Sequence, residues 1–170
     1  MGVMSELVEE IDHHGKVVRI VTRSQMRAEV LRHRCTYVIV RRPSDGAVLV
    51  HRRAVWKDQW PDRWDLAFGG VCGVDEDWEQ SARRELAEEA GVDAAAMDVE
   101  LVDLGAVEFE GDVRVLGRVY EVSTDGPFSF TDGEVQGVQW VPVDELAQWL
   151  DDHVVCDDSL EIVPPLVRDR

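Results

Sequence analysis

The chain has 170 residues, of which 45% are hydrophobic and 31% are charged, and its formal net charge is −17. This composition is typical of a globular protein and excludes a disordered chain, and no apolar run approaches the roughly 20 residues that cross a bilayer. Because so acidic a surface would repel a phosphate backbone, we expect no nucleic acid as partner, and the lack of a long apolar run predicts no membrane either.

The length and the N-terminus predict a single cytoplasmic domain. We expect one domain over residues 1–170, with a strand and a helix in an N-terminal extension over about residues 1–34. Residues 1–16 lack the continuous apolar core of a secretory signal. The three cysteines form no CxxC pair, so we expect buried free thiols: Cys35, Cys72 and Cys156.

The first third of the chain predicts strands around one short helix. Residues 16–23 are rich in Val and indicate a strand, and Ser24 is the expected N-cap of a helix over residues 25–33. Two β-branched runs follow, separated by the turn sequence PSDG. We therefore expect residues 35–42 and 47–53 to form a β-hairpin.

The middle of the chain predicts a strand followed by a well-delimited helix. Residues 64–71 indicate a strand that ends at paired glycines. Asp77 can cap the next helix together with Gln80, as in a capping box, and Gly91 suits the left-handed residue that ends it. Apolar residues recur every four positions in between, so the helix can pack closely on a sheet: Ala82, Leu86 and Ala90.

The last third predicts further strands and one short helix. Residues 99–102, 113–122 and 138–141 are strand-like, and residues 141–150 indicate a short helix, whereas the form of residues 158–170 stays open. Strands interrupted by helices predict an α/β or α+β sandwich with a mixed sheet.

Three acidic residues share one side of the predicted central helix. Glu85, Glu88 and Glu89 lie at positions i, i+3 and i+4, within an arc of about 100°. Like charges at this spacing cost roughly 0.2–0.5 kcal/mol per pair, so the cluster requires either a solvated surface or a cation. Carboxylates suit Mg²⁺ or Mn²⁺, and Mg²⁺ is usually shared between carboxylates and substrate phosphates. A diphosphate is therefore the chemically sensible second partner.

The spacing around these glutamates is more specific than the glutamates alone. Gly70 is followed after five residues by Glu76, and after seven more by the run from Arg84 to Val92. This pattern resembles the Nudix box, G-x5-E-x7-R-E-U-x-E-E-x-G-U with U aliphatic, and every specified position matches. The resemblance implies a hydrolase with an α/β/α sandwich that cleaves nucleoside diphosphate derivatives with divalent cations, Mg²⁺ or Mn²⁺. Family habit also implies a homodimer.

The resemblance assigns metal ligands by position. The carbonyl oxygen of one glycine and three carboxylates would hold the cations: Gly70, Glu85, Glu88 and Glu89. Glu76 and Arg84 would orient these ligands, with the arginine holding a glutamate in place.

A general base is also needed, to take the proton of the attacking water. Glu88 and Glu89 are two candidates within the box. Glu134 is a third, because the sequence TDGEVQGVQW resembles a loop in which many family members place an acidic residue. Glu134 as a plain turn residue is the alternative.

Residues 17–149 also resemble a subset of Nudix proteins related to the type I isopentenyl diphosphate isomerases. The catalytic cysteine of the isomerase would fall at Gly69, and two of its metal histidines would fall at Val71 and near Met26. Only His33 remains of that histidine set, and it can equally be a core histidine or a ligand contact. The isomerase has a degenerate box, whereas this box is complete, so hydrolysis is favoured.

Two basic residues match diphosphate contacts of the isomerase. Arg53 and Lys57 offer a bidentate guanidinium and a mobile ammonium to an anionic ligand. Three tryptophans in the same stretch can pack in the core or stack on a base: Trp56, Trp60 and Trp64. Three further histidines have no evident ligand partner and are expected at the surface: His13, His14 and His51.

The sequence therefore predicts a pyrophosphohydrolase that acts on a small metabolite, a nucleoside diphosphate derivative, with Mg²⁺ as cofactor. Two alternatives stay open. One is an isomerase-like activity, and the other is a catalytically silent Nudix domain that senses a ligand.

Overall fold

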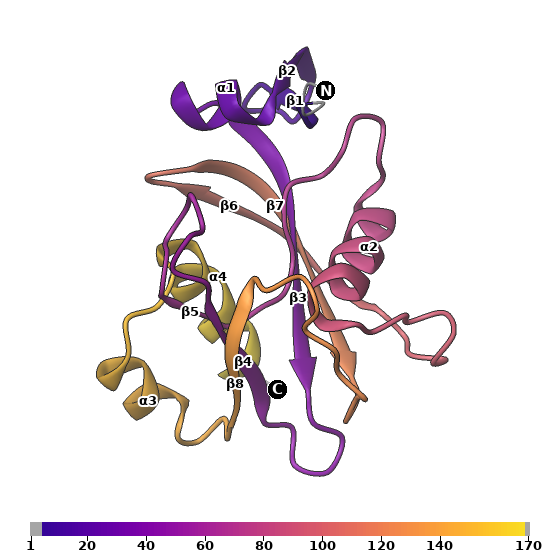
Figure 1. Cartoon of the computed structure of the whole chain (residues 1–170), viewed down its shortest axis with the longest axis vertical. Helices are drawn as coiled ribbons and strands as arrows, with labels where there is room; N and C mark the ends of the chain where they lie inside the picture. The colour runs from indigo at the N-terminus through magenta and orange to yellow at the C-terminus, as the bar shows by residue number, and fades with distance from the viewer. Residues whose placement is uncertain (1–4, 169–170) are drawn as a thin grey trace.

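The computed structural model describes residues 5–168, which fold around a central mixed six-stranded β-sheet (Figure 1). The strands are β1 (Leu7–Ile11), β2 (Val17–Thr22), β3 (Arg32–Arg41), β4 (Val48–Arg53), β5 (Trp64–Asp65), β6 (Val102–Glu110), β7 (Arg114–Ser123) and β8 (Val135–Val141). The helices are α1 (Arg23–Ala28), α2 (Trp78–Ala90), α3 (Leu146–Asp152) and α4 (Asp157–Arg168). Between residues 5 and 168, no helix is long and apolar enough to span a membrane.

The sheet divides where β3 and β4 diverge. Its order is β5-β4-β3-β7-β6, with β8 paired along β4, and β3 and β7 are its parallel pair. β3 and β4 follow each other through the predicted turn but pair only at Arg41 and Val48. Further along, the edge of β3 bonds to the segment before α2, with Phe68 opposite Val38 and Val71 opposite Cys35. The expected hairpin is therefore confirmed only next to its turn.

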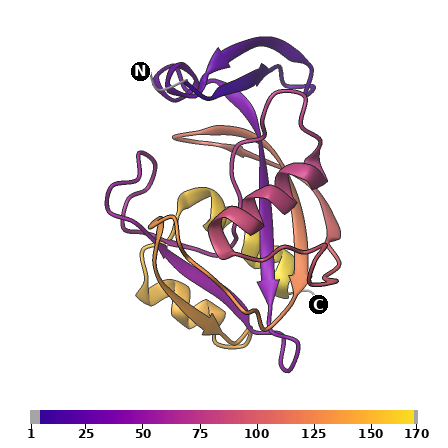
Figure 2. The same cartoon turned by 45° about the vertical axis from the view of Figure 1, so that its right-hand side comes forward.

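Alternate residues of β3 face two different cores, which makes the fold a sandwich. Val38 and Val40 belong to the cluster that contains the buried face of α2, whereas Cys35, Tyr37 and Ile39 pack with residues of α3 and α4. Figure 2 shows α2 on one face of the sheet and α4 on the other. The predicted α/β/α sandwich with a mixed sheet is confirmed.

The caps of α2 agree with the sequence prediction. The Asp77 carboxylate accepts the Gln80 backbone N–H at 2.8 Å, and the Gln80 side chain accepts the Asp77 N–H at 3.2 Å. Gly91 ends the helix with φ of +69°, where a Cβ would lie 2.7 Å from the Ser129 side chain. The predicted stripe is fully buried: Ala82, Leu86 and Ala90. These features fix the register and closeness of α2 on the sheet.

Several predicted element boundaries are wrong. Thr22, not Ser24, caps α1, and the helix ends at Ala28 because Val30 adopts a left-handed φ of +50°. The strand expected over residues 99–102 begins only at its last residue, where β6 starts. The predicted strand over residues 64–71 is split between β5 and the isolated bridges to β3.

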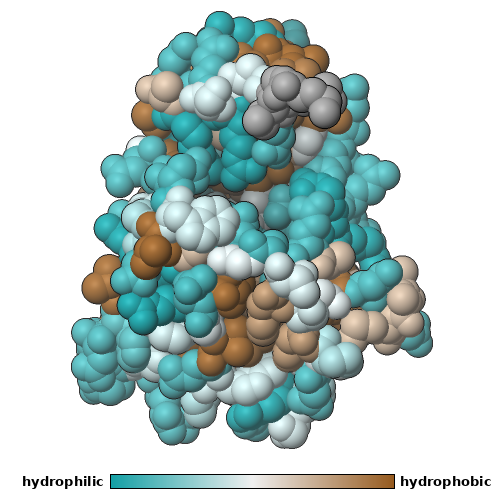
Figure 3. Space-filling model, viewed as in Figure 1, coloured by the Kyte–Doolittle hydropathy of each residue, from teal (hydrophilic) through white to brown (hydrophobic). Residues whose placement is uncertain are grey.

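Two elements were not foreseen. β1 pairs with β2 in a separate two-stranded sheet at one end of the molecule, next to α1 (Figure 1). The C-terminal segment forms α4 up to residue 168, and its last two residues lie outside the described part of the chain, as do residues 1–4 of the N-terminal extension. The surface is largely hydrophilic, with a hydrophobic patch at the N-terminal end (Figure 3). Exposed apolar residues of the β1–β2 sheet are Leu7, Val17, Val18 and Ile20.

Asp77→Ala should destabilise the protein by about 1 kcal/mol, because it removes the N-cap acceptor of α2. Asp77→Asn keeps an acceptor and is the matched control. Urea denaturation followed by circular dichroism measures both changes. An Asp77→Ala variant as stable as wild type would show that the capping box does not hold α2.

Candidate active site

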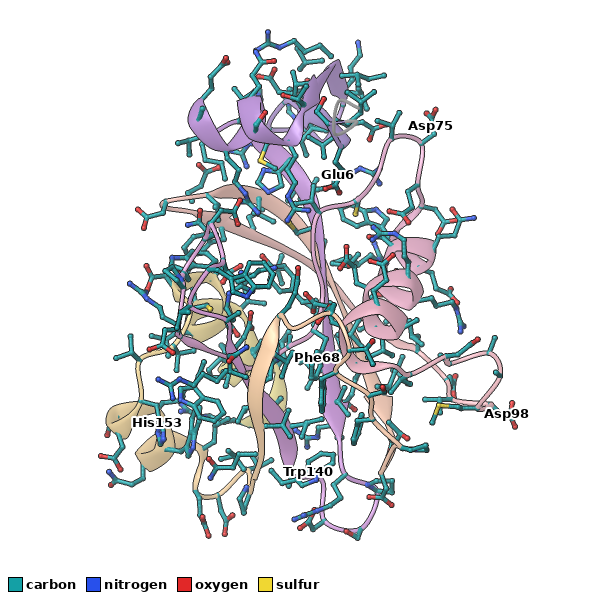
Figure 4. The ribbon with its side chains drawn as sticks, viewed as in Figure 1. Glu6, Phe68, Asp75, Asp98, Trp140 and His153 are labelled. Atoms are coloured by element: carbon teal, nitrogen blue, oxygen red, sulfur yellow. The ribbon has the colours of Figure 1, made fainter. Side chains whose placement is uncertain are left out.

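A cavity of about 380 Å³ lies beside the diverging edge of β3, a size typical of ligand sites. Its walls come from α1, β3, α2 and the loop between β4 and β5. In Figure 4, Glu6 lies towards the α1 end of the molecule and Phe68 near its centre. Nearly all residues predicted for the site line this cavity: Arg53, Lys57, Gly70, Arg84, Glu85, Glu88, Glu89 and Glu134. Acidic and basic candidates thus share one cavity.

Glu85 and Glu89 are buried carboxylates, whereas Glu88 is exposed. The Glu89 carboxylate accepts the backbone N–H of Gly69 at 3.1 Å. Burial, together with the charge of Glu85, raises the pKa of Glu89 to about 8. Burial also raises the pKa of Glu85, although the Arg84 guanidinium opposes that shift. Burial thus disfavours the charged form of both carboxylates. A bound cation would offset that cost, because little water reaches them.

Arg84 connects the other box carboxylates. Its guanidinium donates to Glu76 at 2.7 and 2.9 Å, to Glu85 at 2.8 Å and to Glu88 at 3.2 Å. Glu76 also accepts the Gly73 N–H at 2.7 Å, and the Arg84 contact lowers the pKa of Glu76. Glu76 and Arg84 thus form a pair that fixes the start of α2 and the direction of the guanidinium.

The donor set has the chemistry of a hard-cation site. A Cβ at Gly70 would lie 2.8 Å from the Glu85 carboxylate, so the absence of a side chain lets the carboxylate approach the backbone. The Gly70 carbonyl already accepts the Thr36 N–H at 2.9 Å, which leaves its second lone pair for a further contact. Within residues 5–168, no three acidic, His or Cys side chains stand as a preformed metal group, and Arg84 lies among the carboxylates. Arg84 contacts one oxygen of Glu85 and one of Glu88, which leaves the second oxygen of each carboxylate for a cation.

The two predicted diphosphate contacts are each held by neighbours in the cavity wall. The Lys57 ammonium donates to the Glu134 carboxylate at 2.6 Å. The Arg53 guanidinium donates to the Gln59 carbonyl at 3.0 Å and lies 3.7 Å from the Asp65 carboxylate. Each cation is therefore positioned before any ligand arrives.

Sequence reasoning missed several residues of the cavity. Arg23 and Arg27 enter it from α1, and Asp65 and Asp158 line it from the other side. The Tyr37 hydroxyl donates to Asp158 at 2.9 Å, and burial raises the pKa of Asp158 to about 7. Asp158 lies on a segment whose form stayed open, so no sequence signal could place it in the site.

The histidine, tryptophan and cysteine expectations have mixed outcomes. His51 is 2% exposed and stacks on Phe68 with ring centroids 4.3 Å apart, so its surface assignment is wrong. Trp60 is buried, as the packing interpretation predicts, whereas Trp56 is 61% exposed. The free buried thiols are confirmed: Cys35, Cys72 and Cys156.

Known proteins are similar to this chain in sequence and in fold. The NUDIX domain family matches residues 31–159. The chain is 36% identical over 158 residues to the uncharacterized Nudix hydrolase YfcD of Shigella flexneri, covering 92% of this chain and 84% of that protein. The fold of this chain is similar to that of DR0079 from Deinococcus radiodurans, with a TM-score of 0.79, 23% identity and coverage of 96% and 98% of the two chains. The NUDIX domain of Shewanella oneidensis NrtR, complexed with ADP ribose, gives a TM-score of 0.63 at 18% identity, with coverage of 88% and 99%.

The family match spans most of the chain, and the box residues meet in one cavity, so the chain belongs to the Nudix family. The homologues at this level of identity are named Nudix hydrolases, and hydrolase is the enzyme class that the match supports.

Glu89→Gln should change how stability depends on pH. The pKa of Glu89 is about 8 in the folded protein, against an ordinary value of 4.5 that applies to the unfolded chain. As the pH rises, the unfolded chain therefore loses this proton before the folded protein does. The free energy of unfolding falls as the pH rises towards 8. One pKa unit corresponds to about 1.4 kcal/mol, so between about pH 6 and 8 the variant should gain about 1 kcal/mol or more relative to wild type.

Urea denaturation in the presence of a chelator measures this difference. Glu79→Gln is the matched control, because Glu79 is an exposed carboxylate on the same helix. A Glu89→Gln variant that follows wild type at every pH would mean that Glu89 is ionised in the folded protein.

Proposed function

We propose that this protein hydrolyses the diphosphate linkage of a small nucleoside diphosphate derivative with Mg²⁺ as cofactor. One observation carries the proposal: the buried carboxylates of Glu85 and Glu89 share a cavity with the cations of Arg53 and Lys57. Carboxylates that bind cations and cations that bind phosphates are the two halves of a diphosphate site. The ADP ribose held by the related NrtR domain agrees with this ligand class.

The residues divide the chemistry between them. Gly70, Glu85, Glu88 and Glu89 would hold Mg²⁺, which when bound neutralises phosphate charge and lowers the pKa of a water. Arg84, fixed by Glu76, would keep the carboxylates oriented. The reaction adds one water across the P–O–P linkage, so one carboxylate must accept a proton.

Glu88 and Glu89 are the better candidates for this general base. Glu134 lines the same cavity, but its carboxylate is bound to the Lys57 ammonium at 2.6 Å. Glu88 and Glu89 belong to the carboxylates that would hold Mg²⁺ and its water, whereas Glu134 is paired with a cation proposed to bind phosphate. We therefore propose that Glu134 positions Lys57 against the diphosphate.

The isomerase-like alternative meets a steric obstacle. Its cysteine would stand at Gly69, where a Cβ would lie 1.9 Å from the carbonyl oxygen of Thr36. Any side chain at this position would push the segment away from β3 and move the N–H that binds Glu89. The backbone of this chain is thus built around a glycine, which favours hydrolysis.

We also propose that the chain forms one domain, with β1, β2 and α1 as its N-terminal extension.

Full-length protein incubated with Mg²⁺ and ADP, CDP, GDP, UDP, ADP-ribose or isopentenyl diphosphate should release the hydrolysis products of at least one nucleotide. Glu88→Gln and Glu89→Gln should each lower kcat/KM by at least about 100-fold, because they remove a cation ligand or the base. Chelation should abolish turnover, and added Mg²⁺ should restore it. Product formation is followed by chromatography.

Glu79→Gln is the control variant and should retain full activity, because Glu79 points away from the cavity on the same helix. Formation of dimethylallyl diphosphate would identify the isomerase activity instead. Tight nucleotide binding without turnover would identify a sensor domain.

Lys57→Met and Glu134→Gln should each raise KM by about tenfold, since a charge-assisted hydrogen bond is broken in both. The KM of the double variant should be no higher than that of the single variant with the higher KM, because the two residues act as one unit. Steady-state kinetics on the best nucleotide measures this coupling, with the exposed Lys16→Met as control. A fall in kcat at unchanged KM in Glu134→Gln would instead make Glu134 the general base.

A further inference from the structure

Three residues that line the cavity, one of them on α1, carry polar atoms without hydrogen-bond partners among the described residues. Arg27 Nε, His33 Nε2 and Trp60 Nε1 are buried, and none of them has a hydrogen-bond partner among the described residues. All three side chains line the cavity that holds the box carboxylates. Buried polar groups are normally satisfied, so each such atom requires an explanation. We call Arg27, His33 and Trp60 the α1 subsite.

The hydrogen-bonding role of His33 follows from its second nitrogen. Nδ1 lies 2.8 Å from the carbonyl oxygen of Leu31, and because a carbonyl only accepts, Nδ1 must carry the proton. The ring is 1% exposed, and burial lowers the pKa of His33 to about 4, so the imidazole is neutral at pH 7. Nε2 is therefore an acceptor that faces no donor among the described residues.

The other two members of the subsite are donors. Arg27 Nε lies 3.6 Å from the Asp58 carboxylate, which is an ion pair too long for a hydrogen bond. The Trp60 indole is 8% exposed and carries only a donor. Trp60 also adopts φ of +46°, a conformation that bulky residues rarely take, so the loop holds the ring here against its own preference.

These three atoms form a mixed set that a phosphate does not match. A phosphate offers acceptors only, and the Nε2 lone pair of His33 would face its oxygens. A group that presents a donor beside an acceptor satisfies both types of atom at once. The surrounding wall is partly apolar, with Cys35, Val113 and Val115, as suits the body of a sugar or a base.

We propose that the α1 subsite binds the non-phosphate half of the substrate through an adjacent donor and acceptor, such as a ribose hydroxyl or the amide edge of a nucleobase. This inference rests on the proposed function, because the diphosphate would lie at the carboxylate end of the same cavity. It makes Arg27, His33 and Trp60 specificity residues that distinguish nucleoside diphosphates from simpler diphosphates.

The test compares two ligands that enzymes of this chemistry cannot hydrolyse. Both α,β-methylene-ADP and methylenediphosphonate carry a P–C–P linkage, and only the first has a nucleoside. Each is titrated into the full-length protein with Mg²⁺, and ¹⁵N NMR follows the indole N–H of Trp60, assigned with Trp60→Phe. The nucleoside analogue should shift this signal and bind at least tenfold more tightly than methylenediphosphonate.

Variants measure how this preference depends on the subsite. Trp60→Phe, Arg27→Met and His33→Phe should each reduce the affinity ratio of the two ligands by about fivefold to tenfold. Trp56→Phe and Arg83→Met are matched controls outside the cavity and should keep the wild-type ratio. If His33→Phe fails to fold, the indole signal of the wild-type protein still decides the question.

Further analogues separate the two sources of the group. Loss of preference with the 2′-deoxy analogue assigns the contact to the ribose, and dependence on the base, tested with the UDP analogue, assigns it to the base edge. Either result supports the subsite. Equal affinities with an unmoved Trp60 signal overturn it, even where nucleotides are hydrolysed. A shifted signal in a protein that hydrolyses none of the nucleotides keeps the subsite and contradicts the proposed function.

Discussion

The backbone of the segment before α2 is hydrogen-bonded to the edge of β3, and the geometry of the site follows from this contact. The Thr36 N–H donates to the Gly70 carbonyl and the Cys72 N–H to the Arg34 carbonyl, each at 2.9 Å. Gly69 directly precedes Gly70, at a point where no side chain fits against Thr36. Its N–H consequently points at Glu89 from a position that β3 determines. The strand thus fixes where the buried carboxylate of α2 can lie.

The divergence of β3 from β4 makes this contact available. Had the two strands paired along their whole length, the edge of β3 would be occupied, and the paired glycines could not reach it. Pairing stops after Arg41 and Val48, and β4 takes β8 as its full-length partner. The opening between the strands leaves room for a cavity of about 380 Å³. One local feature of the sheet therefore supplies both the ligand cavity and the wall that holds the carboxylates.

The charges of the box are only partly balanced within the protein. Arg84 binds Glu76, Glu85 and Glu88, whereas the hydrogen bond that the described residues give to Glu89 comes from a neutral N–H. This difference explains why burial raises the pKa of Glu89 to about 8. A single guanidinium cannot compensate four carboxylates, so the arrangement is suited to gain a divalent cation rather than to exist without one.

The sequence specified the box because its constraints are local. Spacing alone predicted the caps of α2, its buried stripe and the shared side of Glu85 and Glu89, since these depend on helical geometry over a few turns. The rest depends on which segments meet. Nothing near Asp158 indicates that a C-terminal helix reaches the cavity, and polar His51 lies in a strand whose two faces are both covered. Long-range packing decides such positions, and one sequence does not reveal it.

The residues proposed for the chemistry and those proposed for substrate selectivity lie on different elements of this molecule. The carboxylates stand on α2, which is capped at both ends and packed through small side chains against the sheet. The unpartnered donors and acceptor stand on other elements: Arg27 on the short α1, Trp60 on the loop after β4 and His33 at the start of β3. Among the described residues, the hydrogen bonds to Glu85, Glu88 and Glu89 come from Arg84 and Gly69 and not from α1 or this loop. Substitutions of Arg27 and Trp60 can therefore change which group is recognised while the carboxylates stay in place, because β3 and α2 hold the carboxylates.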